Sequence, residues 1–147
     1  MEIVFEEKIG NPKKIYEIAE DSFEFGSPLT LKQFEESQDK FLLALEDGQV
    51  IGFLSFTFFL DQGDITNLAV VKKFQQKGVG RLLMLYFLEK MRECCAGEVF
   101  LEVRESNVPA QKFYEQCGFK KISTRKSYYK KPIENANVFC LEVGKRR

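Results

Sequence analysis

A glutamate in the middle of an apolar strand is the first sign of chemistry in this sequence. Glu102 lies within the run 99–104, Val-Phe-Leu-Glu-Val-Arg, where strand alternation places Glu102 and Arg104 on one face. A glutamate among apolar neighbours usually has a task or a partner. Glu102 is therefore a candidate general base, or it is ion-paired with Arg104 or a nearby lysine. The chain has no histidine, which excludes a Ser-His or Cys-His nucleophile and most zinc chemistry, so no metal site is expected.

A second segment has the composition of an anion site. The apolar strand that ends at residues 68–70 is followed by residues 75–81, Gln-Gln-Lys-Gly-Val-Gly-Arg, and then by a long helical pattern. The first N–H groups of a helix have no partner within it, and the helix dipole is positive there. The two glycines would let a diphosphate approach the backbone, and the lysine and arginine add positive charge. The alternative interpretation is a tight turn before a surface helix.

This segment resembles the acetyl-CoA signature of the GNAT acetyltransferase superfamily, [QR]-x-x-G-x-[GA] after a strand ending in L-A-V. The match extends upstream to Thr66 and downstream to Leu83. The resemblance implies that the strand end binds the pantetheine arm of acetyl-CoA with its main chain and that the turn binds the diphosphate. The cofactor-binding residues implied are Leu68, Ala69, Val70, Gln75, Gln76, Lys77, Gly78, Val79, Gly80 and Arg81.

The following third of the chain is similar, more narrowly, to the RimI type of GNAT enzyme, which acetylates protein N-termini. The similar strings are L-E-V-R-x-S-N at residues 101–107 and Y-E-x-x-G-F at residues 114–119. The resemblance implies that Glu102 is the general base, that Tyr114 is the general acid and that Asn107 contacts CoA. It also implies a peptide groove bordered by Arg125, Tyr128 and Tyr129. Taken alone, Asn107 would be a helix cap and Tyr114 a packing residue.

Two segments on the acceptor side depart from this pattern. Residues 25–30 stand where such enzymes often have F-P-W-S, and Glu134-Asn135-Ala136 stands where they often have E-D-A. The sequence predicts direct transfer of acetyl from acetyl-CoA to a protein N-terminal α-amine, for example of a ribosomal protein, in a ternary complex. Acetylation of a small amine, a polyamine or an antibiotic is the alternative within the class. A non-catalytic acyl-CoA-binding module is the alternative outside it.

The elements around these residues predict an α+β fold, a single GNAT domain spanning residues 1–147. The sheet is expected to be mixed and mostly antiparallel, with helices on both faces and a central parallel βαβ unit. The expected strands are 2–8, 41–46, 50–59, 64–71, 99–103, 119–128 and 137–143. The expected helices are one opened by Pro12, a short one capped by Thr30 and Gln33, residues 78–91, and one that has Pro109 in its first turn and ends at Gly118. A hairpin turn is expected at Asp47-Gly48.

Composition limits the partners. Lys plus Arg and Asp plus Glu are both 22, so the chain should not be drawn to nucleic acid or to an anionic membrane. The cysteines form no C-x-x-C pair and are expected to be free thiols in the cytoplasm: Cys94, Cys95, Cys117 and Cys140. The N-terminal residues lack the pattern of a signal peptide. The sequence carries no signal of oligomeric state.

Overall fold

The computed structural model describes residues 1–144, which form two compact units. The first unit consists of residues 1–57 and 66–89, and the second of residues 58–65 and the chain from Lys90 onward. Strand β4 (Gln62–Val70) and helix α3 (Val79–Glu93) each have one part in the first unit and one in the second. The single domain expected over 1–147 stays a prediction.

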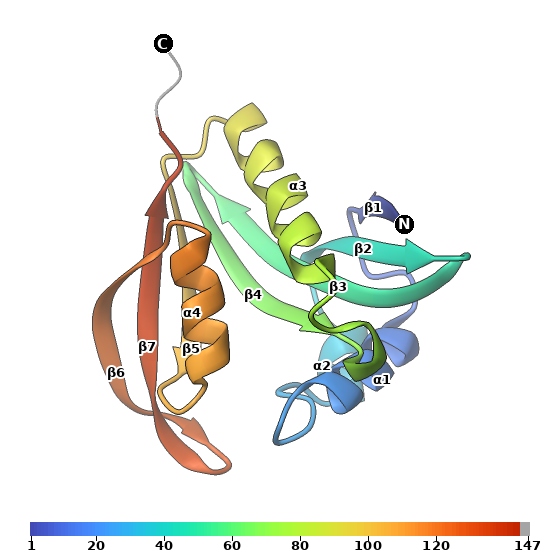
Figure 1. Cartoon of the computed structure of the whole chain (residues 1–147), viewed down its shortest axis with the longest axis horizontal. Coiled ribbons are helices and arrows are strands. Elements are labelled where there is room, and N and C mark those ends of the chain that lie inside the picture. Colours follow the sequence, from blue (N-terminus) through green and yellow to red (C-terminus); the bar gives the residue numbers. More distant parts are fainter. Residues whose placement is uncertain (145–147) are drawn as a thin grey trace. The chain divides into compact units, whose positions relative to one another are not determined.

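The elements follow the chain in the predicted order, and the α+β class is confirmed (Figure 1). The remaining strands are β1 (Glu2–Glu6), β2 (Lys40–Glu46), β3 (Gln49–Phe59), β5 (Glu98–Arg104), β6 (Lys120–Lys130) and β7 (Ile133–Glu142). The other helices are α1 (Pro12–Ser22), α2 (Leu31–Glu35), α4 (Val108–Gln116) and the short 3₁₀ helix η1 (Lys72–Phe74). The sheet has seven strands in the order β1-β2-β3-β4-β5-β7-β6. The β4–β5 pair is parallel, as the βαβ unit predicted, and the β1–β2, β2–β3, β5–β7 and β6–β7 pairs are antiparallel.

Local sequence signals account for most element ends. Thr30 and Gln33 form the predicted capping box at the start of α2. Asp47 and Gly48 both have positive φ, 50° and 77°, which is the backbone of the type I′ turn expected between β2 and β3. The predicted start of the last strand at residue 137 is wrong, because β7 pairs with β6 from Ile133. This pairing continues almost to the turn, through residues whose own strand propensity is low.

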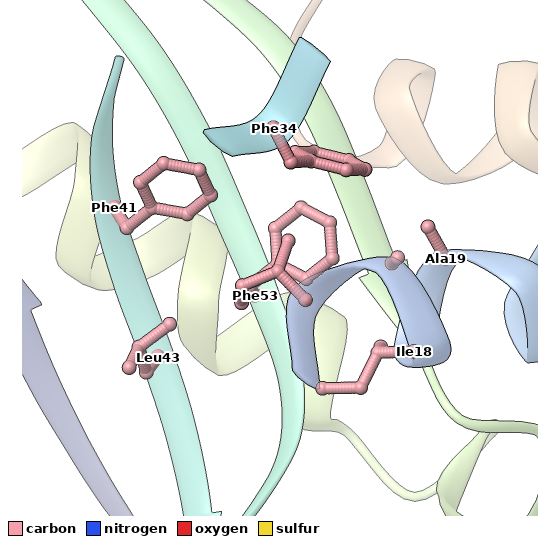
Figure 2. Packing of buried hydrophobic residues seen from close by; sticks show 8 residues of the cluster. Ile18, Ala19, Phe34, Phe41, Leu43 and Phe53 are labelled. Carbon is pink, nitrogen blue, oxygen red and sulfur yellow. The ribbon is translucent and has the colours of Figure 1, made fainter. Parts of the chain in front are cut away.

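The core of the first unit lies on both faces of strands β2 and β3. On one face, Phe53 packs between Phe34 and Phe41, with ring centroids 6.3 and 5.8 Å away, and Ile18 and Ala19 of α1 cover the same cluster (Figure 2). On the other face, Phe56 meets Phe87 of α3 at 5.0 Å, since successive strand residues point to opposite sides. The strands are thus covered by α1 and α2 on one side and by α3 on the other.

In the second unit, helix α4 covers one face of β5 and β7 (Figure 1). Tyr114 of α4 lies 6.4 Å from Phe139 of β7 and 5.9 Å from Phe119, measured between ring centroids. Phe139 pairs with Leu101 of β5, so both point toward the helix. Glu102, the next residue of β5, therefore points to the opposite face.

Candidate functional site

The end of strand β4 presents main-chain groups at two edges. The Val71 N–H donates to the Ile51 carbonyl oxygen at 2.9 Å, so the main chain of Val71, and of Ala69 two residues earlier, faces β3. The intervening Val70, and Leu68 before it, direct their N–H and C=O groups to the other edge. Among the three predicted pantetheine-binding residues, Leu68 and Val70 are therefore the two placed to offer main-chain groups away from β3.

The turn before α3 contains two residues with left-handed backbone. Gln76 and Gly78 have φ of 60° and 84°, which is the left-handed region that favours glycine. A Cβ added at Gly78 would meet no atom within 4 Å, so the backbone is open there. The first hydrogen bond of α3 is from the Leu82 N–H to the Gly78 carbonyl at 3.0 Å. The N–H groups of residues 79–81 precede it and have no partner within the helix.

The side chains of Gln75 and Lys77 make a hydrogen bond and a cation–π contact at this turn. The Gln75 side-chain amide donates to the Val70 carbonyl at 2.8 Å, which attaches the turn to the strand end. Lys77 places its Nζ 5.7 Å from the centre of the Phe74 ring. A run of main-chain N–H groups without partners in the helix, with lysine and arginine beside it, fits the diphosphate of a CoA.

Glu102 is ion-paired, with a partner that the sequence did not indicate. Its carboxylate lies 2.9 Å from an Arg125 guanidinium nitrogen of β6, and the two side chains are 29% and 59% exposed. The alternative expected from the sequence was an ion pair with Arg104 or a nearby lysine, and the ion pair observed is with Arg125. Arg125 reaches Glu102 across β7, because β7 lies between β5 and β6.

Two tyrosines of β6 lie close to this ion pair. Arg125 stands over the Tyr128 ring at 5.4 Å, and burial together with the negative charge of Glu102 raises the pKa of Tyr128. Burial and then Glu102 also raise the pKa of Tyr129 to about 12. The structure thus brings Glu102, Arg125, Tyr128 and Tyr129 together.

A bulge in β6 makes this grouping possible. Between the pairs Arg125–Ala136 and Tyr129–Glu134, β6 advances four residues while β7 advances two. At the bulge Ser127 has φ of 50°, and its N–H donates to the Asn135 side-chain oxygen at 2.9 Å. Without the extra residues, Arg125 and Tyr128 would point to opposite faces.

Tyr114 is buried in α4, and its phenol is held in the protonated form. Burial raises the pKa of Tyr114 far above its usual value, with smaller contributions from Cys117 and Tyr129. Tyr129 makes the smallest of these contributions to the raised pKa of Tyr114.

Asn107 performs the capping role that its position predicted. Its side-chain oxygen accepts from the Ala110 N–H at 3.2 Å at the start of α4. The side-chain NH₂ is the group of Asn107 that could contact a cofactor.

Sequence reasoning did not assign a role to Glu134. Its carboxylate accepts from the Ser106 N–H at 2.5 Å and from Arg104 at 3.2 Å. Arg104 also donates to the carbonyls of Lys131 and Pro132 and lies 4.3 Å from the centre of the Tyr129 ring. Glu134 thereby joins the β6–β7 hairpin to the end of β5. The only signal in the sequence was the resemblance of residues 134–136 to E-D-A.

The fold and these two groups of residues define an acetyltransferase that uses an acyl-CoA. The chain belongs to the Acetyltransferase (GNAT) family, which it matches over residues 12–119. It is 34% identical over 135 residues to the [Ribosomal protein bS18]-alanine N-acetyltransferase of Haemophilus influenzae, covering 87% of this chain and 90% of that protein.

Solved structures show the same fold. The ribosomal-protein-S18-alanine N-acetyltransferase from Escherichia coli superposes with a TM-score of 0.87 at 22% identity, over 99% of this chain and 97% of that one. Ard1 from Thermoplasma volcanium superposes with a TM-score of 0.79 at 29% identity, over 97% and 99% of the two chains. No helix within residues 1–144 is long and apolar enough to cross a membrane.

The Glu134 contacts predict a pH dependence of stability. The hydrogen bond from Ser106 lowers the pKa of Glu134 against the opposing effect of burial, and Arg104 lowers it further. A carboxyl whose pKa is lower in the folded state stabilises the protein above its unfolded-state pKa, and this stabilisation is lost as pH falls through the folded-state pKa. We expect Glu134→Gln to lower the melting temperature at neutral pH, and the gap from the wild type to narrow below the ordinary value of 4.5. Thermal melts across this range test it, and a gap independent of pH would contradict it.

Proposed function

We propose that this protein transfers the acetyl group of acetyl-CoA to the N-terminal α-amine of a protein, of which a ribosomal protein is the first candidate. The observation that carries the proposal is the 34% identity, over 87% of the chain, with an enzyme that acetylates the alanine of ribosomal protein bS18. Both Glu102 and Tyr114 are retained in this chain. Their presence favours an enzyme over a non-catalytic acyl-CoA-binding module.

The charges around Glu102 favour a peptide over a polycation. The Arg125 guanidinium, 59% exposed, pairs with Glu102 at 2.9 Å. Arg104, on the same face of β5 as Glu102, pairs with Glu134 at 3.2 Å. Each of these carboxylates is already paired with an arginine, so the group offers no excess of negative charge to attract the several positive charges of a polyamine. A protein N-terminus brings a single ammonium group, which can replace Arg125 beside the carboxylate.

The α-amine is also the easier acceptor to deprotonate. Its ordinary pKa is about 7.7–8.0, against about 10.4 for a lysine side chain. Near neutral pH a fair fraction is already the free base, and one carboxylate acting through water is sufficient for the remainder. We assign this task to Glu102.

The cofactor-binding residues are proposed in two groups. The main chain at Leu68, Ala69 and Val70 would hold the pantetheine arm, mainly through the edge of Leu68 and Val70 that faces away from β3. Residues 75–81 would hold the diphosphate with the N–H groups at the start of α3 and the charges of Lys77 and Arg81. Bound acetyl-CoA supplies the thioester. Asn107 would contact the cofactor through its side-chain NH₂.

We assign the acyl transfer to groups at the end of β4, on β5 and in α4. A main-chain N–H at the end of β4 would polarise the thioester carbonyl. The acceptor nitrogen attacks the carbonyl carbon, Glu102 takes the proton from the nitrogen through water, and Tyr114 offers its hydroxyl proton to the departing sulfur. The raised pKa of Tyr114 keeps this proton in place before each turnover. Arg125, Tyr128 and Tyr129 would border the acceptor peptide.

We further propose that residues 1–147 work as one domain in the cytoplasm. The continuity of β4 and α3 through both units supports the first point. The four cysteines support the second, since none of them forms a disulfide within residues 1–144 and disulfides are rare in the cytoplasm.

Replacing the two proposed proton-transfer residues should reduce turnover without unfolding the protein. We expect Glu102→Gln and Tyr114→Phe each to lower kcat by about 100-fold or more, the usual contribution of a positioned acid or base. Tyr114→Phe keeps the ring that packs on Phe119 and Phe139. Turnover is followed by release of free CoA thiol at saturating acetyl-CoA.

Control substitutions of the same residue types are available at exposed positions away from the proposed site. Glu98 is an exposed glutamate at the other end of β5, and Tyr86 is an exposed tyrosine of α3. Glu98→Gln and Tyr86→Phe should keep kcat within about twofold of the wild type, as expected for surface substitutions. Near-wild-type kcat in both Glu102→Gln and Tyr114→Phe would show that the assigned roles are wrong.

The acceptor is tested by competition between amine classes. Purified protein with acetyl-CoA is offered a peptide that begins with alanine, the same peptide with a blocked N-terminus, and spermidine. We expect kcat/KM for the free peptide to exceed that for spermidine by at least about tenfold near neutral pH, given the difference in amine pKa, and no turnover of the blocked peptide. Preference for spermidine would replace the proposed acceptor with a small amine.

A further inference from the structure

Three side chains hold the main chain where β4 ends. The Val70 N–H donates to the Ser22 hydroxyl oxygen at 3.3 Å, and the Lys72 N–H donates to the Asp21 carboxylate at 2.7 Å. The Gln75 amide donates to the Val70 carbonyl at 2.8 Å. Asp21 and Ser22 are the last two residues of α1, and neither was assigned a role from the sequence. The C-terminus of α1 is therefore attached directly to the strand end.

The Ser22 contact uses a donor at the edge that faces away from β3. Val71 donates to Ile51 of β3, and a Cβ on Gly52 of β3 would lie 2.9 Å from the Ala69 carbonyl oxygen. Both observations show that the main-chain groups of Ala69 and Val71 face β3. Because neighbouring strand residues direct these groups to opposite edges, the Val70 N–H points away from β3. This is the edge assigned above to the pantetheine arm.

We propose that the Ser22 hydroxyl and a carbonyl oxygen of acetyl-CoA compete for the Val70 N–H, and that Ser22 is a positioning residue which gives up this donor when the cofactor binds. The inference rests on the proposed function, because it assumes a CoA at the strand end. The competing acceptor is an amide carbonyl oxygen of the pantetheine arm, which free CoA carries as well as acetyl-CoA.

The geometry favours a carbonyl that replaces Ser22 as the acceptor of the Val70 N–H over two acceptors that share this donor. One N–H makes one strong, nearly linear hydrogen bond, usually at about 2.9–3.0 Å for an oxygen acceptor. The Ser22 bond is longer than this at 3.3 Å, so it is a weak bond that a better placed carbonyl can replace. The Asp21 bond to Lys72 is short and charge-assisted, and it can keep α1 attached while Ser22 moves.

Competition has a thermodynamic signature that distinguishes it from a simple structural contact. A bond made only in the free protein stabilises that form and opposes ligand binding by the same free energy. Removing the Ser22 hydroxyl should therefore destabilise the free protein, tighten cofactor binding, and leave the stability of the CoA complex unchanged.

The experiment uses Ser22→Ala in the full chain, with CoA as the titrant. Calorimetry should give a Kd for CoA about threefold lower than that of the wild type, the effect of one weak hydrogen bond. The melting temperature should fall by about 2 °C without CoA and match that of the wild type at saturating CoA. Ser22→Thr, which keeps the hydroxyl, should behave like the wild type.

Ser37→Ala is the matched control. The Ser37 hydroxyl also accepts from a main-chain N–H, that of Asp39, at 3.1 Å, but it lies in the segment between α2 and β2. Its removal should lower the melting temperature equally with and without CoA and leave the Kd unchanged.

The outcomes separate this inference from the function on which it rests. If wild-type protein does not bind CoA, the proposed function is wrong and the inference is wrong with it. If the wild type binds and Ser22→Ala has the same or a higher Kd, competition is refuted while the proposed function stands. An equal loss of melting temperature with and without CoA would refute it in the same way.

Discussion

Main-chain hydrogen bonding at the junction of β4, η1 and α3 is the constraint on which the proposed cofactor site depends. Every main-chain N–H removed from water needs a partner, and at this junction the regular ladder and helix bonds are interrupted. Side chains of Asp21, Ser22 and Gln75 provide partners for the strand end. At the other side of the junction, the N–H groups of residues 79–81 precede the first helix bond. A diphosphate is the kind of ligand that such a row of donors suits.

A second backbone irregularity determines the surroundings of Glu102. The bulge in β6 lets Arg125 and Tyr128 approach the same carboxylate, although they are three residues apart. Asn135 holds the bulge through the Ser127 N–H, and Glu134 ties the neighbouring hairpin to Ser106 and Arg104. Residues 134–136, Glu-Asn-Ala, differ from E-D-A only at the second position, where asparagine keeps a side-chain oxygen. Their contacts hold the β6–β7 hairpin and the bulge against the end of β5.

Local signals in the sequence were sufficient for the element order and for most caps and turns. The Thr30–Gln33 capping box, the Asp47-Gly48 turn and the left-handed Gly118 at the end of α4 depend on residues a few positions apart. Alternation along residues 99–104 correctly separated Glu102 from its apolar neighbours. The resemblance to GNAT enzymes then predicted, from the sequence alone, that residues 75–81 form a diphosphate-binding turn.

Contacts between distant segments were outside the reach of such signals. Arg125 is 23 positions after Glu102 in the sequence and meets it only because β6 and β5 flank β7. Ser22 meets Val70, 48 residues later, and no pattern in either segment indicates the pairing. The bulge in β6 depends on an asparagine of the next strand, and the early start of β7 depends on pairing with β6. In each case the partner is fixed by packing of the fold rather than by neighbouring residues.

The most direct test of the proposed cofactor site is a titration of ¹⁵N-labelled protein with CoA, followed through the amide resonances in solution. The account predicts that the largest shifts occur at the amides of Val70, Val79, Gly80 and Arg81, while the exposed turn at Asp47 and Gly48 stays unchanged. Saturable CoA binding that leaves the amide resonances of residues 79–81 unshifted would contradict the proposed diphosphate site.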